Sequence, residues 1–184
     1  MNEIKQKIIQ CSIELFSEKG YHGTSMRDIM KASGCTQPTL YYYFLNKKTL
    51  FREVILGEFS RLINTIIIDI DTTLPIKDFY VQAVIKRKHL TEYQKKVYKL
   101  AIQAWHGMIE DQEISNKLRK WGYGLIEDRE KIFAQYFSDS KRLKTFTNLL
   151  MNVFMNITEQ IIMTDFDISD EEIEERFSML FELI

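Results

Sequence analysis

The chain has 184 residues, of which 45% are hydrophobic and 12% aromatic, and its formal net charge is −1. This composition excludes an intrinsically disordered chain, and the 7 Gly and 2 Pro exclude collagen-like and low-complexity classes. So few turn-forming residues also argue against an all-β fold, which needs a turn about every 8 to 12 residues. We therefore expect an all-α protein.

No segment predicts a membrane span, because apolar runs such as residues 66–68 are far shorter than the roughly 18 residues required. The start of the chain lacks the basic residues and apolar run of a signal peptide, so we expect the protein in the cytoplasm. Its three histidines, His22, His89 and His106, are dispersed in the sequence. We therefore expect neither a metal site nor a cofactor.

The small net charge hides an asymmetry along the chain. Residues 1–52 contain eight Lys or Arg and four Asp or Glu, a net charge of +4, which leaves −5 for the remainder. A basic segment on an acidic body suits a nucleic-acid partner for that segment alone, because neutralised phosphates supply most non-specific affinity. Charge fluctuations of this size also occur in proteins that bind no polymer, so this signal leaves both possibilities open.

The first predicted helix has apolar residues spaced by three or four up to Gly20. A second, short helix begins after Ser25, which stands three residues before Asp28 in the arrangement of a capping box. It ends at Gly34, a residue suited to the left-handed conformation at a helix C-terminus.

Two further helices follow closely. Thr36 can cap a third short helix, in which Pro38 is tolerated because its missing amide would have no partner in the first turn. Asn46 can cap a longer helix over residues 47–68, which ends at the break 69–75. The second and third helices, joined by residues 33–36, match a helix-turn-helix, whose second helix enters the DNA major groove.

The third helix has an outward face without any carboxylate. Gln37 can bind adenine through two hydrogen bonds, Arg27 can do the same to guanine, and Pro38 or a Thr methyl can pack on a thymine methyl. Tyr hydroxyls and lysines suit phosphates. Each residue also has a plain structural interpretation as a packed tyrosine or a solvated polar side chain, but the combination on one face favours DNA binding.

The N-terminal segment resembles the DNA-binding region of the TetR (tetracycline-repressor-like) family over about residues 4–56. The resemblance is carried by Gly20-Tyr21, by the run Thr24 to Ile29, by the run Ser33 to Phe44 that contains Gln37-Pro38-Thr39-Leu40-Tyr41-Tyr42-Tyr43-Phe44, and by Asn46-Lys47-Lys48 with Leu50. The sequence departs from the family at Met30 and Ser33, which replace small alanines, and at Pro38, which replaces a common glycine.

The resemblance implies a three-helix DNA-binding domain, residues 1–48, on a larger helical domain, residues 49–184, that binds a small-molecule effector and dimerises. Helix 47–68 would link the two domains. It also implies that Arg27, Gln37 and Pro38 contact bases, and that Ser25, Thr39, Tyr41, Tyr42 and Lys47 contact the DNA backbone. We group Thr36, the predicted cap, with these DNA-binding residues.

Two C-terminal segments, 142–163 and 169–184, support a dimer independently of the resemblance. The first is apolar on nearly all sides, so it needs cover both from its own domain and from another surface. Either a partner subunit or a single-chain bundle core provides that cover, and we favour a homodimer, which predicts a palindromic DNA operator. The expected interface residues are Phe146, Leu150, Phe154, Ile157, Phe177 and Phe181.

Residues 93–137 are rich in aromatic side chains, which suit an apolar effector pocket, although most are expected in the core. The candidates for effector contact are Tyr98, Trp105, His106, Trp121, Tyr123 and Phe133. The carboxylates of Glu110, Asp111 and Glu113 are interpreted as a loop or helix start.

Three classes of function remain open at this point. The first is a transcriptional repressor that a small apolar or amphipathic ligand releases from its operator. The second is a DNA-binding protein of the same fold controlled by a protein partner. The third, an enzyme, is not expected, because the sequence has no phosphate-binding loop, nucleophile elbow or HExxH motif.

Overall fold

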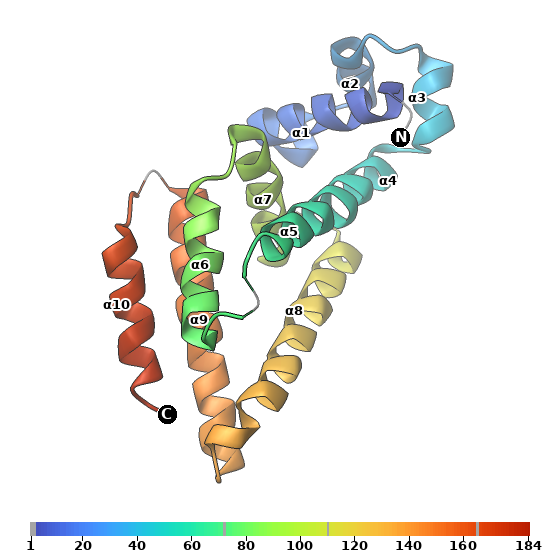
Figure 1. Ribbon diagram of the computed structural model, residues 1–184. Helices are drawn as coiled ribbons and strands as arrows, with labels where there is room; N and C mark the ends of the chain where they lie inside the picture. Colours follow the sequence, from blue (N-terminus) through green and yellow to red (C-terminus); the bar gives the residue numbers. More distant parts are fainter. Residues whose placement is uncertain (1–2, 72, 110, 165) are drawn as a thin grey trace. The chain divides into compact units, whose positions relative to one another are not determined.

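The computed structural model describes residues 3–71, 73–109, 111–164 and 166–184, and within helix α8 the side chains of 121–129 lie outside this description. Within these ranges every regular element is helical, as the sequence predicts. The N-terminal helices are α1 (Glu3–Gly23), α2 (Met26–Ser33), α3 (Gln37–Tyr43), α4 (Lys47–Arg52), the π-helix η1 (Glu53–Glu58) and α5 (Phe59–Ile68). The later helices are α6 (Ile76–Lys88), α7 (Glu92–Trp105), α8 (Gln112–Phe133), the 3₁₀ turn η2 (Ala134–Tyr136), α9 (Ser140–Met163) and α10 (Asp170–Phe181) (Figure 1).

The chain forms two compact units. The first unit comprises Met1–Asn64 and Thr91–Asn116, and the second comprises Thr65–Leu90 and Lys117–Ile184. Helices α5 and α8 each begin in the first unit and continue into the second. The proposed boundary between a DNA-binding domain, 1–48, and an effector domain, 49–184, is a functional division and stays a prediction.

The first unit has a core built on α1. Ile8, Ile9, Ile13 and Phe16 of this helix are 0–1% exposed, and the Phe16 ring meets the edge of the Phe51 ring at a centroid distance of 5.0 Å. Helix α1 packs against α2 and α7, and α7 packs against η1. Helices α2 and α4 therefore pack on a helix whose buried face is mostly apolar.

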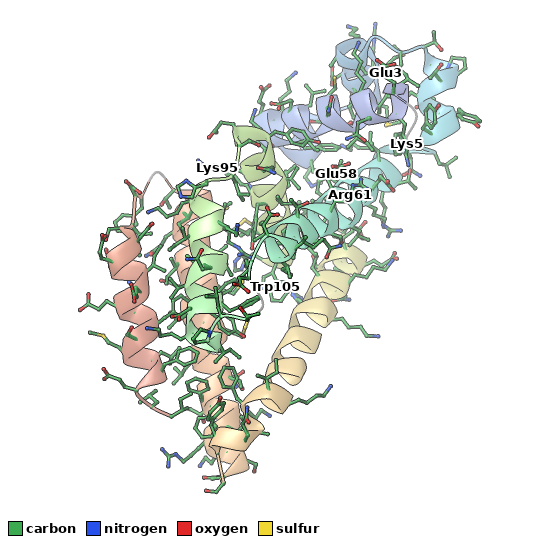
Figure 2. All side chains as sticks on the ribbon, in the orientation of Figure 1. Glu3, Lys5, Glu58, Arg61, Lys95 and Trp105 are labelled. Carbon is green, nitrogen blue, oxygen red and sulfur yellow. The ribbon has the colours of Figure 1, made fainter. Side chains whose placement is uncertain are left out.

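The long helix after Asn46 is continuous from Lys47 to Ile68, but it contains the π-helix η1, which the sequence does not predict. Ion pairs lie at both ends of η1: Lys5 Nζ is 3.3 Å from Glu53 Oε1, and Arg61 Nη2 is 2.5 Å from Glu58 Oε1. Lys5, Glu58 and Arg61 are labelled in Figure 2. A π-helix bonds each amide to the carbonyl five residues earlier, one more than an α-helix, so it accommodates an extra residue in the turn.

The second unit is a bundle in which α6, α9 and α10 pack against one another, as Figure 1 shows. Aromatic rings fill its interior: Tyr80 lies 5.9 Å from Phe154 and 6.2 Å from Phe177, measured between ring centroids. Phe133 and Phe146 form a second contact at 4.9 Å. In the described part of the chain, no helix is both long and apolar enough to span a bilayer.

Candidate DNA interface

The helix-turn-helix begins with the predicted capping box. Asp28 N donates to Ser25 Oγ at 3.1 Å, and Ser25 N donates to Asp28 Oδ2 at 3.0 Å. Each bond satisfies an amide that has no partner within the helix. Because the hydroxyl and the amide of Ser25 both donate to the carboxylate, the pKa of Asp28 is lowered. The start of α2 is fixed by these two side chains.

The turn between α2 and α3 depends on a glycine in the left-handed region. Gly34 has φ +66° and ends α2, where its amide donates to Lys31 O at 3.3 Å. A side chain at this φ would be strained, so glycine suits the position. Gly20 plays a related part upstream: its φ of +72° breaks α1 where the sequence predicts the end of the helix, although one more helical turn follows to Gly23.

The recognition helix α3 starts at Thr36 as predicted, since Thr39 N donates to Thr36 Oγ1 at 3.4 Å. Pro38 lies in the first turn. Leu40 and Phe44 are buried at 1% and 3% exposure and anchor the helix to the core. The helix is thus held by its inner face and its caps.

The outer face of α3 presents the residues assigned to DNA. Tyr42 is 81% exposed and Tyr41 is 46% exposed. Gln37 and Pro38 are exposed and Thr39 is half-buried, while Ser25, Arg27 and Thr36 are exposed on the neighbouring turns. No acidic side chain lies within α3. These polar and aromatic groups are therefore available to a polyanion, and their contacts with DNA remain a prediction.

Lys47 differs from the other predicted backbone contacts, because protein groups already bind it. Its Nζ donates to Tyr21 O at 2.7 Å and to Thr24 O at 2.9 Å, and it lies 4.3 Å from the centroid of the Tyr21 ring. An ammonium has three N–H donors, so one donor remains after these two bonds. Lys47 thus ties the start of α4 to the corner between α1 and α2, a role that the sequence does not indicate.

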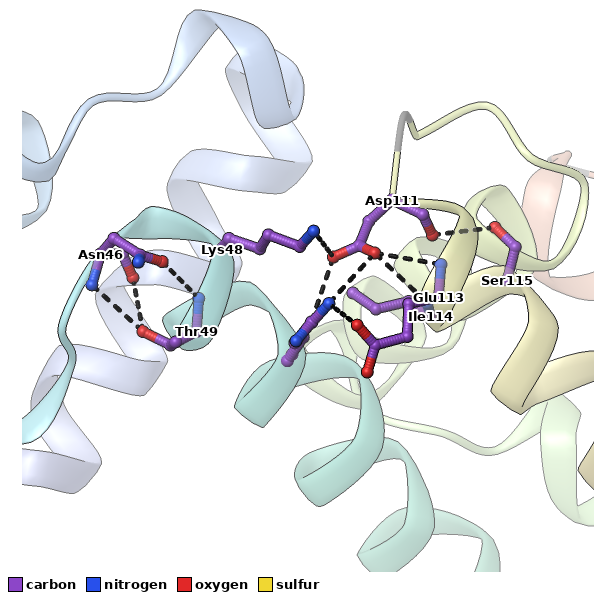
Figure 3. Close-up of polar contacts among 8 residues, drawn as sticks. Asn46, Lys48, Thr49, Asp111, Glu113, Ile114 and Ser115 are labelled. Carbon is purple, nitrogen blue, oxygen red and sulfur yellow. Dashed lines mark hydrogen bonds and ion pairs between the residues drawn. The ribbon is translucent and has the colours of Figure 1, made fainter.

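Two other basic residues on α4 form ion pairs around Asp111 (Figure 3). Arg52 Nε lies 3.1 Å and Lys48 Nζ 3.5 Å from Asp111 Oδ2, and Arg52 also bonds Glu113. The sequence places Asp111 and Glu113 at a loop or helix start, which is confirmed because α8 begins at Gln112. It does not indicate the pairing with α4, since 59 residues separate Arg52 from Asp111. Glu110 lies outside the described residues.

The predicted effector residues whose side chains are described are divided between the two units. Tyr98 is 4% exposed and packs against Phe59 at 5.1 Å between ring centroids, Trp105 is half-buried, and His106 is exposed at the end of α7. Phe133 belongs to the second unit and is fully buried. The side chains of Trp121 and Tyr123 lie outside the described residues. Their role in effector binding stays a prediction.

The predicted interface residues lie mainly inside the second unit. Leu150, Ile157 and Phe177 are fully buried, Phe146 and Phe154 are 3% and 8% exposed, and Phe181 is half-buried. They therefore form the apolar interior that underlies the α9 and α10 surface. Among the described residues, the large exposed apolar side chains on and just after these two helices are Leu149, Phe166, Met179, Leu183 and Ile184.

Two capped short helices, a left-handed glycine turn and an exposed, acid-free second helix define a helix-turn-helix DNA-binding protein. Residues 8–54 match the sequence model of the bacterial regulatory proteins of the tetR family. The N-terminal segment of the chain is thus similar to the DNA-binding region of the TetR family of transcriptional regulators, and the match spans the helix-turn-helix.

The chain is also similar in sequence to curated regulators and in fold to solved structures. The chain is 28% identical over 155 residues to the biofilm operon icaADBC HTH-type negative transcriptional regulator IcaR of Staphylococcus aureus. The aligned residues cover 80% of this chain and 78% of IcaR. This chain is 36% identical to IcaR of Staphylococcus epidermidis over 42% of each chain. A TetR-like regulator from Rhodococcus sp. RHA1 has the same fold, with a TM-score of 0.76, 17% identity and coverage of 98% and 94%. Salmonella enterica GusR has a TM-score of 0.70, 18% identity and coverage of 99% and 98%.

Proposed function

We propose that the protein is a repressor that binds a palindromic operator as a homodimer and is released by a small apolar or amphipathic ligand. The observation that carries the DNA-binding part is the exposed, acid-free face of α3, flanked by Arg27. Repression is supported by the relatives, since IcaR of both Staphylococcus species is named a negative transcriptional regulator.

In this proposal Gln37, Pro38 and Arg27 contact base edges in the major groove. Tyr41, Tyr42 and Thr39 contact phosphates together with Ser25 and Thr36, and fix the register of the helix on the duplex. Lys47 contributes mainly by holding α4, and its remaining N–H donor is directed to a phosphate. Steric occupation of a promoter then blocks transcription.

The dimer is proposed to form through α9 and α10, the helices that the family resemblance assigns to this role. The exposed apolar residues Leu149, Met179 and Leu183 support a partner surface there, because burying them removes apolar area from water. A ligand would release the DNA by favouring a conformation in which two recognition helices no longer fit successive grooves. Its effect is limited by its difference in affinity for the two conformations.

Selection of the purified protein on random double-stranded DNA tests the proposal, followed by titration of the enriched duplex at two salt concentrations. We expect a palindrome and an affinity that falls steeply with salt, because phosphate contacts release counterions. Light scattering of the complex should give two chains per duplex. Absence of any enriched sequence, from protein that denaturing extraction and mass spectrometry show to be free of ligand, would contradict DNA recognition.

Control by a protein partner is the second candidate, with the same DNA-binding element and no small molecule. Screening small apolar compounds for loss of the operator complex separates the two candidates. Release by a compound at a stoichiometric concentration supports the ligand, whereas release only by a protein fraction supports the partner.

A further inference from the structure

Asp111 combines two structural tasks in the first unit. Its Oδ1 accepts hydrogen bonds from Glu113 N at 3.2 Å and Ile114 N at 3.4 Å. Asp111 therefore caps the N-terminus of α8. Its Oδ2 accepts from Arg52 Nε at 3.1 Å, and Lys48 Nζ lies 3.5 Å away (Figure 3). One carboxylate therefore joins the start of α8 to helix α4.

The contact of Asp111 with Arg52 and Lys48 is called the Asp111 joint below. The groups around the Asp111 carboxylate keep it charged. Burial by itself raises the pKa of Asp111, but Arg52, the Ile114 amide and Lys48 outweigh burial, so the pKa is lowered. The hydrogen bond to Asp111 is the main reason why the pKa of Arg52 is raised. The Asp111 side chain is only 6% exposed. Salt screens such a buried charge much less than it screens a surface pair.

Other ion pairs within the first unit are more exposed. Glu14, which bonds Lys96, has a 42% exposed side chain, and the Lys5 and Glu53 side chains are 28% and 35% exposed. Exposed pairs of this kind contribute little to holding two helices in place. Among the described residues, the Asp111 carboxylate is therefore the most enclosed charge that links α4 or its neighbours to the later helices of the first unit.

The location of the joint gives it a consequence for DNA binding. Helix α4 follows α3 after only three residues, 44–46, so its position constrains the recognition helix. Helix α8 begins next to Asp111 in the first unit and continues into the second from Lys117 onward. The carboxylate thus lies where the chain leaves the unit that contains the helix-turn-helix.

We propose that Asp111 is a positioning residue for operator recognition: by binding Arg52 and Lys48 it fixes α4, and with it the recognition helix, to the start of α8. The inference rests on the proposed dimeric operator complex, in which the separation of two recognition helices must match the spacing of two half-sites. The joint determines how strictly that spacing is enforced, and it makes no contact with DNA.

The test compares Asp111→Asn with Asp139→Asn, a matched control. Asp139 caps α9 through a 2.8 Å bond from Lys141 N and belongs to the second unit. Asn caps helices as well as Asp does, so both variants keep a cap and lose one charge. The probes are the selected duplex, the same duplex with one base pair inserted between its half-sites, and a single half-site.

For wild type and Asp139→Asn we expect the inserted base pair to reduce affinity at least tenfold. For Asp111→Asn we expect a reduction below threefold, with half-site affinity unchanged within about twofold. Hydrogen exchange gives an independent readout: amides of α4 should exchange about tenfold faster in Asp111→Asn than in the control. Arg52→Gln, which removes the same pair from the other side, should reproduce both results and replaces Asp111→Asn if that variant does not fold.

Unchanged exchange in α4 overturns the proposal whatever happens on DNA. Faster exchange with an unchanged spacing preference overturns the positioning role as well. Equal effects of the Asp111 and Asp139 variants also reject it, because the cap and not the joint would then be responsible. Failure of the proposed function is separate: wild type would select no palindrome, while the exchange experiment would still decide whether Asp111 fixes α4.

Discussion

The helix-turn-helix and the α6, α9 and α10 bundle achieve order in different ways. Helices α2 and α3 have eight and seven residues, so most of their amides and carbonyls lie in a terminal turn, and side-chain caps with a left-handed glycine hold them. Helix α9 has 24 residues and is held by buried apolar side chains. Short helices that caps stabilise at their ends can leave one face exposed to DNA. Long helices that buried side chains stabilise along their length have less exposed surface.

The bundle should be the more sensitive of the two regions to loss of volume. Phe177 is fully buried against Tyr80, so Phe177→Ala should reduce the free energy of unfolding by about 3–5 kcal/mol. Urea denaturation followed by circular dichroism measures this change. Glu175→Ala, at an exposed position of the same helix, should stay within about 0.5 kcal/mol of wild type, and equal effects of the two variants would contradict the comparison.

The exposed face of α3 should show the opposite behaviour. Gln37→Ala should weaken operator binding by about 1–3 kcal/mol and relax the preference at one base position, with little change in stability. Titration against the selected duplex and its single-base variants gives both quantities. Gln82→Ala, at an exposed position of α6, is the control and should bind as wild type does. Equal loss on operator and random DNA would mean that Gln37 does not contact a base.

Removing a cap should have a smaller effect than either change. Ser25→Ala deletes the hydroxyl that accepts from Asp28 N and should reduce stability by about 1 kcal/mol. Thermal and urea unfolding measure the difference. The control is Ser60→Ala, an exposed serine of α5, and a loss as large as that of Ser25→Ala would show that the cap is not the cause.

The capping box also predicts a weak pH dependence. Because the folded pKa of Asp28 is below its unfolded value, its contribution to stability is present above about pH 4 and is lost as the pH falls through the folded pKa. The stability difference between wild type and Asp28→Asn should therefore shrink in acid. Unfolding curves from pH 7 to pH 3 test the sign, and a difference that grows in acid would refute it.

Sequence predicts the helix-turn-helix closely because its signals are local. The caps at Ser25, Thr36 and Asn46 and the C-cap at Gly34 are confirmed, since each acts on amides or carbonyls within a few residues. The Asp111 joint is not predictable in this way, because its partners lie about 60 residues away and a buried carboxylate looks like a solvated one in sequence. The π-helix is missed because its apolar spacing differs from an α-helix by a single residue.

Outside the helix-turn-helix, the sequence predicts which segments are helical better than it predicts what each residue contacts. The 142–163 segment is confirmed as helical within α9, but its most apolar residues, such as Leu150 and Ile157, face the interior. An apolar residue that packs inside a chain and one that packs against a second chain have the same chemistry. The DNA, effector and dimer residues therefore stay predictions.

The π-helix η1 bears on how this sequence tolerates changes in length. Each residue of an α-helix advances the chain by about 100° around the axis, so deleting one residue from an α-helical segment would turn everything before it by that angle. A π turn can absorb such a deletion by becoming an ordinary α-helix. Deletion of one residue from 53–58 is therefore expected to convert η1 into α-helix and keep the angular phase between α4 and α5, whereas the same deletion in an α-helical part of 47–68 would turn α4 relative to α5.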